Sequence, residues 1–562
     1  MTLKNINSSF ILFIIFFLCG NVHAQKKLET LFLTWKEDPT STMSINWHTL
    51  ERMSNDSIYY RMKGDSVWIS RPSDKKHFPF SERLVCNVNL KNLNADAQYE
   101  FKVGHLEEIY WFKTMPTEIQ DKSVVFAIGG DTYDRDLNAP RHMWMERMNR
   151  AALDYNPDFI VWGGDLAYAD GREDQIWRWY GWFEAVRNSL IRPDGKVIPI
   201  IVAIGNHEVN TSYYEWGADY EDSDAQRTRS APYFYSLFDF PGQPGYNVLD
   251  FSDYLSLIIL DSDHTNPISG KQTQWLEKVL SERTKVDHVF PVYHVPAYPS
   301  TKSDMNQRST KRVREYWSSL FDQYNLTFAF EHHDHAYKRT FPIRNEQIDP
   351  DGVIYLGDGG WGTKVREVKL VDTTWYLEKT QRVRYALMVS LYRDQTHLLA
   401  IDEYGNTVDE YPVIFDRPHE QIQTNAGMLP DGGVTISAEF AQRAGTVYFD
   451  SYYPGFSDGG YGWFETREEP SSLTWTIPVH ESGKYKVRLR YSNMINRISS
   501  SMYINGETHP IKLNFDNTST RYEWAETNII QVNLMKGMNE LKFECSNVTE
   551  FFIDCIEVVP MR

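Results

Sequence analysis

Short alternating runs of apolar and polar residues occupy both ends of the chain, whereas longer apolar runs dominate its middle. Between Leu28 and Pro116, polar turns separate six alternating runs, which is the pattern of a small β-sandwich. The six runs are LFLTW, MSINWHT, SIYYRM, VCNVNL, YEFKVG and IYWFKT. Because this segment holds no group of residues suited to catalysis, we expect it to be a scaffold packed on the next domain.

From about Ser123 the pattern changes to apolar runs that alternate with helical stretches, which predicts an α/β domain ending near Asp416. The runs expected to form strands are VVFAIG, FIVWGG, VIPIIVAIG, LSLIIL, HVFPVYH, LTFAFE and VIYLGDGG. A helix is expected between Ser269 and Arg283, since the apolar positions 275, 276, 279 and 280 share one helical face.

The alternating pattern returns from about Gln421 to Arg562 and predicts a β-sandwich or jelly roll. Its expected strands are LTWTIPV, YKVRLRYSN, SSMYING, NIIQVNL, NELKFEC and FFIDCIEVV. The pairs Ser482-Gly483, Asn505-Gly506 and Lys536-Gly537 predict hairpin turns between them.

Composition narrows the class of protein. A chain of 562 residues is too long for one hydrophobic core, and its 41% hydrophobic and 24% charged residues are typical of globular domains. The formal net charge of -18 argues against a broad surface for nucleic acid or anionic membranes, which needs clustered Lys and Arg. We therefore expect no nucleic acid partner.

The first 24 residues predict a signal peptide, with Lys4 before the apolar run Phe10–Leu18 and small residues ahead of a cleavage site after Ala24. The run has about half of the ~20 residues needed to cross a bilayer, so the mature chain should have no integral membrane segment. We expect a secreted or periplasmic protein, with a lipid anchor on Cys19 as the alternative. The expected domains are residues 25–118, 119–418 and 419–562.

Three cysteines would remain in the mature chain, Cys86, Cys545 and Cys555, which is too few for a disulfide scaffold. Cys545 and Cys555 lie in what reads as the last strand pair. A disulfide between them and two separate buried thiols are both open.

Five segments of the middle region place polar residues directly after an expected strand. In an open α/β sheet such positions converge at one edge, although they lie far apart in sequence. The segments are GGDTYD with Asp131, GGDLAYAD with Asp165 and Tyr168, GNHE with Asn206, His207 and Glu208, PVYHVPAY with His294, and EHHDHAYKR with His333 and His335. Each alone could be a turn, a helix cap or a core residue. Their recurrence favours a metal site.

The donor set favours two metal ions. Two carboxylates, a phenol, an amide and three imidazoles are more donors than a four-coordinate zinc needs. Carboxylate and phenolate oxygens suit Fe(III) or Mn(II), and imidazole and amide groups suit Zn(II) or Fe(II). An aspartate shared between ions about 3.5–4 Å apart would let the pair activate a water and stabilise a phosphorane-like transition state.

These motifs resemble those of the purple acid phosphatases within the binuclear metallophosphoesterases, and GGDLAYAD is the most specific of them. The resemblance implies a central αββα sandwich. It further implies a ferric ion bound by Asp131, Asp165, Tyr168 and His335, and a divalent Zn, Fe or Mn ion bound by Asn206, His294 and His333 with Asp165 as the bridge. Charge transfer from the Tyr168 phenolate to Fe(III) would colour the protein.

The implied activity is acid phosphatase activity, in which a metal-bridging hydroxide attacks a phosphomonoester. His207 would bind the phosphate and help protonate the leaving group, which makes His207 and the bridging Asp165 the expected catalytic residues. Glu208 would orient His207 or cap its loop, and Arg339 would attract the substrate or form a structural salt bridge. The alternatives are a phosphodiesterase or nucleotidase on the same site, and an inactive glycan-binding protein.

Three positions depart from the family pattern. Thr132 and Tyr133 follow Asp131 where the family has Asp-x-Gly, His332 stands where the family has glycine, and Pro291 replaces valine ahead of His294. None removes a ligand.

The outer domains carry resemblances of their own. The spacing of Trp35, Trp47 and Tyr99 is similar to that of a fibronectin type III-like domain. The C-terminal segment resembles galactose-binding-like jelly rolls, including carbohydrate-binding modules, through Ala438-Glu439, KYKVRLRYSN, Asn505-Gly506 and FIDCIEVV. This implies glycan stacking on Tyr461, Trp463, Tyr522 or Trp524, unless these aromatics are core, and a structural calcium held by Glu439 and Asp554.

Overall fold

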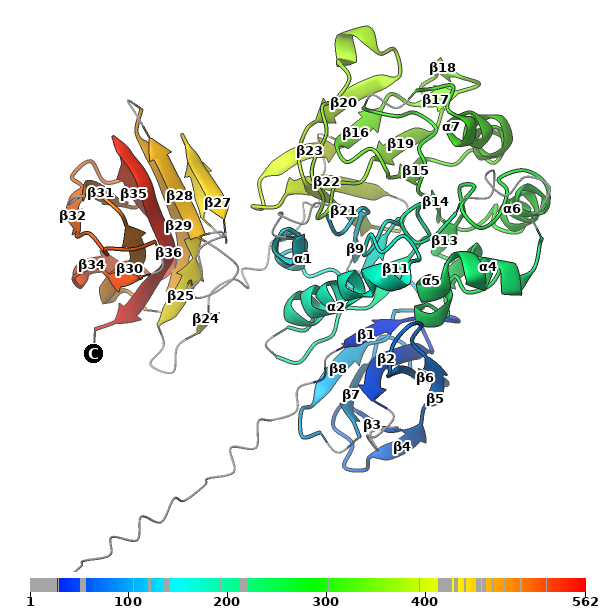
Figure 1. Cartoon of the computed structure of the whole chain (residues 1–562), viewed down its shortest axis with the longest axis horizontal. Helices are drawn as coiled ribbons and strands as arrows, with labels where there is room; N and C mark the ends of the chain where they lie inside the picture. Colours follow the sequence, from blue (N-terminus) through cyan, green and yellow to red (C-terminus); the bar gives the residue numbers. More distant parts are fainter. Residues whose placement is uncertain are drawn as a thin grey trace, which may run out of the picture.

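The computed structural model has an N-terminal β-sandwich, a central α/β domain and a C-terminal β-sandwich (Figure 1). It describes residues 28, 30–50, 57–104, 106–119, 123–134, 141–192, 194–211, 221–301, 304–393, 395–412, 427–428, 433–438, 441–450, 456, 461–466, 469–479, 481–495, 498–521 and 523–561. The predicted signal peptide, its cleavage after Ala24, Cys19 and the boundary at residues 418 and 419 lie outside the described residues.

The N-terminal domain consists of two four-stranded antiparallel sheets. One has the order β1 (Leu31–Thr34), β2 (Met43–Leu50), β6 (Arg83–Leu90), β5 (Asp74–His77). The other has the order β4 (Ile69–Pro72), β3 (Ser57–Met62), β7 (Gln98–Val103), β8 (Tyr110–Lys113). All six predicted strands are confirmed. The sequence pattern did not predict β4 and β5, because their residues are mostly exposed and do not alternate.

This domain packs on the central domain through a shared apolar core. Trp35 is fully buried, and its ring meets the rings of Phe159 and Phe251 edge-on, with centroids 5.7 Å away in both cases. The contact supports the expected role of the domain as a scaffold.

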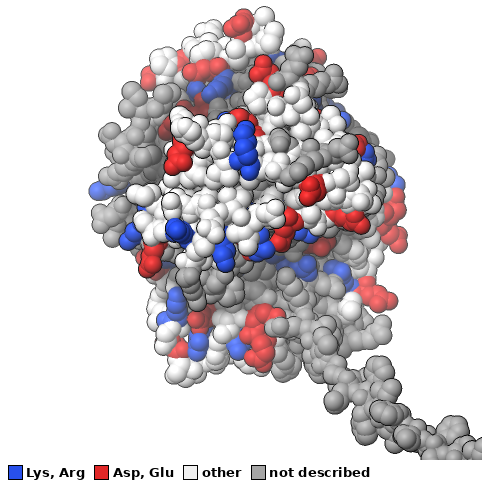
Figure 2. Space-filling model, turned by 90° about the vertical axis from the view of Figure 1, so that its left-hand side faces the viewer, with Lys and Arg blue, Asp and Glu red and all other residues white. Residues whose placement is uncertain are grey.

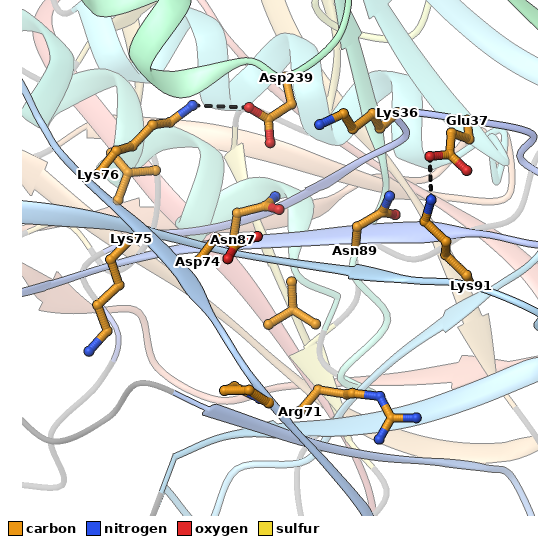
Figure 3. A pocket seen from close by; sticks show the side chains of 13 residues that line it. Lys36, Glu37, Arg71, Asp74, Lys75, Lys76, Asn87, Asn89, Lys91 and Asp239 are labelled. Carbon is orange, nitrogen blue, oxygen red and sulfur yellow. Dashed lines mark hydrogen bonds and ion pairs between the residues drawn. The ribbon is translucent and has the colours of Figure 1, made fainter.

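A polar cavity of about 510 Å³ lies at the seam between the same two domains (Figure 3). Lysines of the sandwich line it together with Asp239 of the central domain, and Lys76 Nζ lies 3.0 Å from the Asp239 carboxylate. None of the predicted metal ligands lines this cavity.

The central domain contains two mixed sheets. The first has the order β11 (Ile200–Val202), β10 (Phe159–Trp162), β9 (Val124–Gly129), β21 (Tyr385–Leu391), β22 (Thr396–Asp402), β23 (Thr407–Tyr411). The second has the order β12 (Asn247–Phe251), β13 (Leu255–Ile259), β14 (His288–Val292), β15 (Phe328–Glu331), β19 (Ile354–Gly357), β16 (Tyr337–Thr340), β20 (Leu377–Gln381). Strands β9 to β11 are parallel to one another, as are β13, β14, β15 and β19.

Helices cover the outer faces of the two sheets. They are α1 (Arg141–Leu153), α2 (Ile176–Leu190), α4 (Asp224–Ser230), α5 (Pro232–Leu237), α6 (Lys271–Ser281), α7 (Arg308–Val313) and α8 (Ser319–Gln323), and the π-helix η3 (Arg314–Ser318) joins α7 to α8. The domain also contains the short 3-10 helices η1 (Glu173–Gln175) and η4 (Val371–Thr373) and the hairpin of β17 (Ile343–Arg344) and β18 (Gln347–Ile348). The predicted helix is confirmed as α6.

Alternate residues along the strands separate the layers. In β9, Phe126 and Ile128 join a core that also contains Leu257 and Phe290 of the second sheet, whereas Ala127 packs in the core beneath α1 and α2. A further core joins the second sheet to α6, η3 and α8. The domain is therefore the αββα sandwich that the resemblance implied.

The C-terminal domain is all-β. One sheet contains β24 (Gly427–Met428), β25 (Val434–Ser437), β36 (Val548–Pro560), β28 (Tyr461–Thr466), β27 (Val447–Asp450), β30 (Gly483–Asn493), β33 (Ala525–Glu526) and β34 (Ile530–Leu534). The other has the order β26 (Gln442–Ala444), β29 (Ser471–Val479), β35 (Gly537–Cys545), β31 (Ile498–Ile504), β32 (Ile511–Phe515). On the face seen in Figure 2, described basic side chains are interspersed with acidic ones.

Only one of the three predicted hairpins forms. Asn505-Gly506 joins β31 to its partner β32. Ser482-Gly483 and Lys536-Gly537 instead lead the chain from one sheet to the other, because β29 and β35 lie opposite β30 and β34. A glycine turn therefore marked the strand ends here without fixing the pairing.

Cys545 and Cys555 lie in opposite sheets of the C-terminal domain. Cys545 pairs with Ser471 in one sheet and Cys555 with Ser437 in the other, and no disulfide joins the described cysteines. Both thiols are buried, so the structure has the separate thiols rather than the hairpin disulfide. No helix in the described part of the chain is long and apolar enough to cross a membrane.

Candidate metal centre

Five parallel strands deliver the predicted ligands to one edge. Asp131, Asp165 and Asn206 follow the neighbouring strands β9, β10 and β11, and the three histidines follow β14 and β15 of the other sheet. Asp131 and Asp165 adopt φ values of 58° and 55°, and His333 and His335 adopt 80° and 58°. Left-handed backbone at non-glycine residues is costly and gathers at functional sites. Hydrogen bonds between the loops hold this backbone, for example from the Asp131 N–H to the Gly164 carbonyl and from the Asp165 N–H to the Glu208 carboxylate.

The first group of donors consists of Asp131, Tyr168 and His335. The Tyr168 hydroxyl donates to Asp131 Oδ1 at 3.1 Å and lies 3.1 Å from His335 Nε2, which is itself 3.0 Å from Asp131 Oδ1. All three side chains are buried. The three atoms thus form a nearly equilateral triangle.

The second group surrounds His294 Nε2. That nitrogen lies 3.1 Å from Asp165 Oδ2, 3.2 Å from Asn206 Oδ1 and 3.3 Å from His333 Nδ1. The two groups are linked, because the His333 backbone N–H donates to Asp131 Oδ2 at 3.0 Å.

These separations fit metal coordination. Ligands about 2.0–2.1 Å from an ion and about 90–109° apart lie about 2.9–3.4 Å from one another. Asp165 Oδ2 is buried and accepts no hydrogen bond within the described residues, which suits a donor atom reserved for a cation. The carboxylate, phenol and imidazole groups present therefore fit the predicted pair of metal ions.

The protonation states fit at three of the donors. Burial opposes ionisation of Asp131, but His335 and His294 outweigh it and lower the pKa of the carboxyl to about 2. Burial is likewise outweighed at Asp165, where His294 and His207 hold the pKa well below its usual value. Burial and the nearby His294 lower the pKa of His333 to about 4, which keeps that ring neutral. Metals bind the deprotonated forms of these groups.

At His294, burial is outweighed by Asp165, which raises the pKa to about 9. Burial raises the pKa of Tyr168 well above its usual value, so a metal ion would have to displace a proton from each of these two groups.

Backbone carbonyls orient two of the imidazoles. His294 Nδ1 lies 2.9 Å from the Gly163 carbonyl, and His335 Nδ1 lies 3.1 Å from the Lys364 carbonyl. Each contact places the N–H on Nδ1 and leaves Nε2 to face the donors.

His207 lies beside the second group with a partner that the sequence reasoning missed. Its Nδ1 is 2.5 Å from Asp170 Oδ1, its ring stacks on Tyr168 with centroids 4.2 Å apart, and its Nε2 lies 4.0 Å from Asp165 Oδ2. Burial opposes protonation, but Asp165 and Asp170 raise the pKa of His207. Asp170 is the last residue of GGDLAYAD, so the signal stood inside a motif already singled out.

Glu208 occupies the position of a loop cap. Its two carboxylate oxygens accept hydrogen bonds from the backbone N–H groups of Asp165, Leu166 and Gly205 at 2.7–2.8 Å. The side chain is buried and ties the loop after β10 to the loop after β11, which is the capping alternative.

Arg339 forms the structural salt bridge that was one of its two expected roles. It lies within β16, buried, with Nε 2.7 Å from Asp409 Oδ2 and a second ion pair to Glu378. A different arginine, Arg366, lies at the centre, with Nη2 3.4 Å from His335 Nε2. No motif marked it.

The departures from the family pattern are accommodated. The Thr132 hydroxyl donates to the Leu166 carbonyl at 2.8 Å and accepts from Trp182 Nε1 at 3.0 Å, which anchors the loop of Asp131. Tyr133 is buried against Gly181 of α2, away from the donors. Pro291 keeps its place in β14 opposite Ile258.

The residues of the C-terminal domain that were expected to bind glycan or calcium differ in their surroundings. Tyr461 is fully buried against Trp524 and Phe552, so it is a core residue rather than a surface for sugar stacking. Trp463 is half-buried. Glu439 and Tyr522 lie outside the described residues. Asp554 forms an ion pair with Arg490, and its role as a calcium ligand stays a prediction.

Comparisons with known proteins agree with the motifs. Residues 28–114 match the purple acid phosphatase N-terminal domain, and residues 126–337 match the calcineurin-like phosphoesterase family. The chain is 26% identical over 296 residues to purple acid phosphatase 22 of Arabidopsis thaliana, an alignment covering 51% of this chain and 61% of that relative, less than two thirds of its length.

Solved structures are similar as well. The purple acid phosphatase PPD1 from yellow lupin seeds covers 68% of this chain and 73% of its own, with 16% identity and a TM-score of 0.55. The C-terminal region resembles a family 35 carbohydrate binding module from Clostridium thermocellum, with 20% identity and a TM-score of 0.21 over 23% of this chain and 98% of that one. The chain therefore carries a purple acid phosphatase N-terminal domain followed by a calcineurin-like metallophosphoesterase domain.

Proposed function

We propose that the chain hydrolyses phosphomonoesters at a two-metal centre. The observation that carries the proposal is the convergence of two donor groups from five strand ends, with separations suited to coordination. The proposed ligands are Asp131, Asp165, Tyr168, Asn206, His294, His333 and His335. When bound, the metal pair would polarise the phosphoryl oxygens and lower the pKa of the attacking water.

The two groups differ in the ion they suit. Asp131 and Tyr168 offer hard oxygen donors, so the first group is proposed to hold Fe(III). Asn206, His294 and His333 offer amide and imidazole donors suited to Zn, Fe or Mn in the divalent state. Asp165 is proposed as the bridge between the two ions.

The remaining polar side chains have separate tasks. His207, held by Asp170 and by stacking on Tyr168, keeps Nε2 on the side of the donors. Its raised pKa favours the protonated ring, which can donate a hydrogen bond to a phosphate oxygen and a proton to the leaving alkoxide. Glu208 joins the loop that carries Asp165 to the loop that carries Asn206.

Two measurements on purified protein test the proposal. Turnover of para-nitrophenyl phosphate should exceed that of bis(para-nitrophenyl) phosphate, and turnover of the diester alone would favour the phosphodiesterase or nucleotidase alternative. Elemental analysis should find two metal ions per chain in active preparations. A fully metallated protein that hydrolyses neither ester would favour the inactive, glycan-binding alternative.

We also propose glycan binding by the C-terminal domain at Tyr448 and Trp463. Their rings lie 6.1 Å apart, and Tyr448 is 50% exposed. Aromatic faces of this kind stack on apolar faces of sugar rings. Electrophoresis through gels containing xylan, mannan or pectin should retard the protein, and Trp463→Ala should abolish the retardation. Equal mobility of both proteins in every gel would contradict this.

Export of the chain by the predicted signal peptide is part of the proposal. It rests on the sequence pattern alone. N-terminal sequencing of protein recovered outside the cytoplasm should begin at Gln25, whereas a lipid on Cys19 would support the anchored alternative.

A further inference from the structure

Arg366 differs from its neighbouring arginines in its partners, none of which is acidic among the described residues. Arg339, Arg382 and Arg384 each form an ion pair with a carboxylate. Arg366 instead donates from Nη1 to the His333 carbonyl at 3.2 Å and places Nη2 3.4 Å from His335 Nε2. Within the described part of the chain, no carboxylate pairs with it.

The position of Arg366 is set by backbone contacts. Its N–H donates to the His335 carbonyl at 3.0 Å, so the segment after β19 runs along the loop that carries both histidines. The side chain is half-buried, which leaves part of the guanidinium open to a ligand. The guanidinium therefore lies against the donor triangle of Asp131, Tyr168 and His335.

A cation in this place is unfavourable on its own. His335 Nε2 is one of the proposed metal donors, so a bound ion and the guanidinium would repel each other. With the proposed Fe(III) and divalent ion, three anionic donors, Asp131, Asp165 and Tyr168, and one hydroxide would leave a net charge of about +1. The missing component is an anion that both the metal pair and Arg366 can bind.

We propose that Arg366 binds the phosphoryl oxygens of the substrate and selects phosphomonoester dianions over phosphodiester monoanions. The proposal rests on the proposed phosphatase function and adds the substrate charge that the site selects. A planar guanidinium matches two phosphate oxygens, which suits it to this task better than an ammonium group. A phosphomonoester carries nearly two charges at neutral pH, whereas a diester carries one and has fewer free oxygens.

The test compares Arg366→Gln with the matched variant Arg382→Gln, which removes an exposed guanidinium paired with Glu367. Inorganic phosphate binding to metal-loaded protein is measured by calorimetry, beside metal content and kinetics on the two para-nitrophenyl esters. Loss of a charge-assisted contact should weaken phosphate binding and raise the monoester KM by about 10- to 100-fold, with a smaller change for the diester.

Arg366→Lys keeps the charge without the planar fork and should fall between wild type and Arg366→Gln. Arg382→Gln should resemble wild type. Unchanged phosphate affinity in Arg366→Gln, or equal losses for both esters, would overturn the proposal. Loss of metal from both Arg366 variants would also overturn it, because the side chain would then only hold the histidine loop. A wild-type protein without phosphomonoesterase activity would refute the proposed function, and phosphate binding would still test Arg366.

Discussion

Replacing Asp170 with asparagine should slow the hydrolysis of alkyl phosphates without removing metal. Asp170 Oδ1 lies 2.5 Å from His207 Nδ1, and the Asp170 N–H donates to the His207 carbonyl at 2.9 Å. Asparagine keeps the size of the side chain and an acceptor oxygen, but it loses the charge that favours protonated His207. The loop should therefore persist while the ring becomes a weaker and less well oriented acid.

The structure sets the size of this effect. A hydrogen bond to a charged group contributes about 1.5–3 kcal/mol and a neutral one about 0.5–1.5 kcal/mol, so the exchange should cost about 1–1.5 kcal/mol. That corresponds to a kcat about 5- to 15-fold lower for a substrate such as glycerol phosphate, whose alkoxide must be protonated as it leaves. para-Nitrophenolate leaves without a proton, so kcat for para-nitrophenyl phosphate should fall by less than about 3-fold.

The assay measures kcat for both esters and the metal content of each protein. The matched control is Asp174→Asn, because Asp174 is exposed and pairs with Arg172 rather than with His207. It should stay within about twofold of wild type. Equal losses on both esters would refute the role of the Asp170 and His207 pair in protonating the leaving group, and so would an unchanged rate on the alkyl ester.

Three further changes probe other parts of the centre. Asp165→Ala should leave fewer than two metal ions per chain and no measurable turnover, and elemental analysis with substantial retained activity would contradict the bridging role. Tyr168→Phe should remove any visible absorption band of the iron-loaded protein while retaining some hydrolysis; a band of full strength in the variant would exclude the tyrosinate assignment. Arg339→Gln breaks the buried pair with Asp409 and should cost about 3–5 kcal/mol of stability, measured by denaturant unfolding, with KM unchanged. A raised KM at native stability would instead support a substrate role for Arg339.

The sequence predicted which polar side chains converge, because their signals are local. A Gly-Gly-Asp segment that ends an apolar strand fixes both the place of the aspartate and the direction of the chain, and parallel strands bring such ends together. Asp131 and Asp165 accordingly follow adjacent strands, and the Asp131 N–H donates to the Gly164 carbonyl at 2.9 Å.

The partners of charged side chains were predicted poorly, because they come from other segments. Glu208 was expected either to orient His207 or to cap its loop, and the sequence did not show that its oxygens bind the loop after β10, more than forty residues earlier in the chain. Arg339 follows the histidine motif, but its partner Asp409 is 70 residues away on β23. Arg366 follows no motif, and only the fold brings it to His335.

The same limit applies to the fold. Alternation of apolar residues located the strands that bury one face, but it missed the exposed strands β4 and β5. It also could not assign consecutive strands to sheets, since β34 and β35 read as a hairpin and lie in opposite sheets. The local alternation of apolar residues determines which side chains are buried. Which strands pair depends on contacts between distant segments, and the alternation does not contain that information.

His332 explains why two of the metal loops need their glycines. Its buried ring fills the space above Gly130 and Gly163, where an added Cβ would lie 2.8 Å and 1.7 Å from the nearest ring atom. The His332 N–H donates to the His294 carbonyl at 3.0 Å, so one residue touches the loops of Asp131, Asp165 and His294. His332 therefore packs between the loops of the centre. Burial lowers its pKa to about 3, so the ring is neutral and adds no charge beside the metal donors.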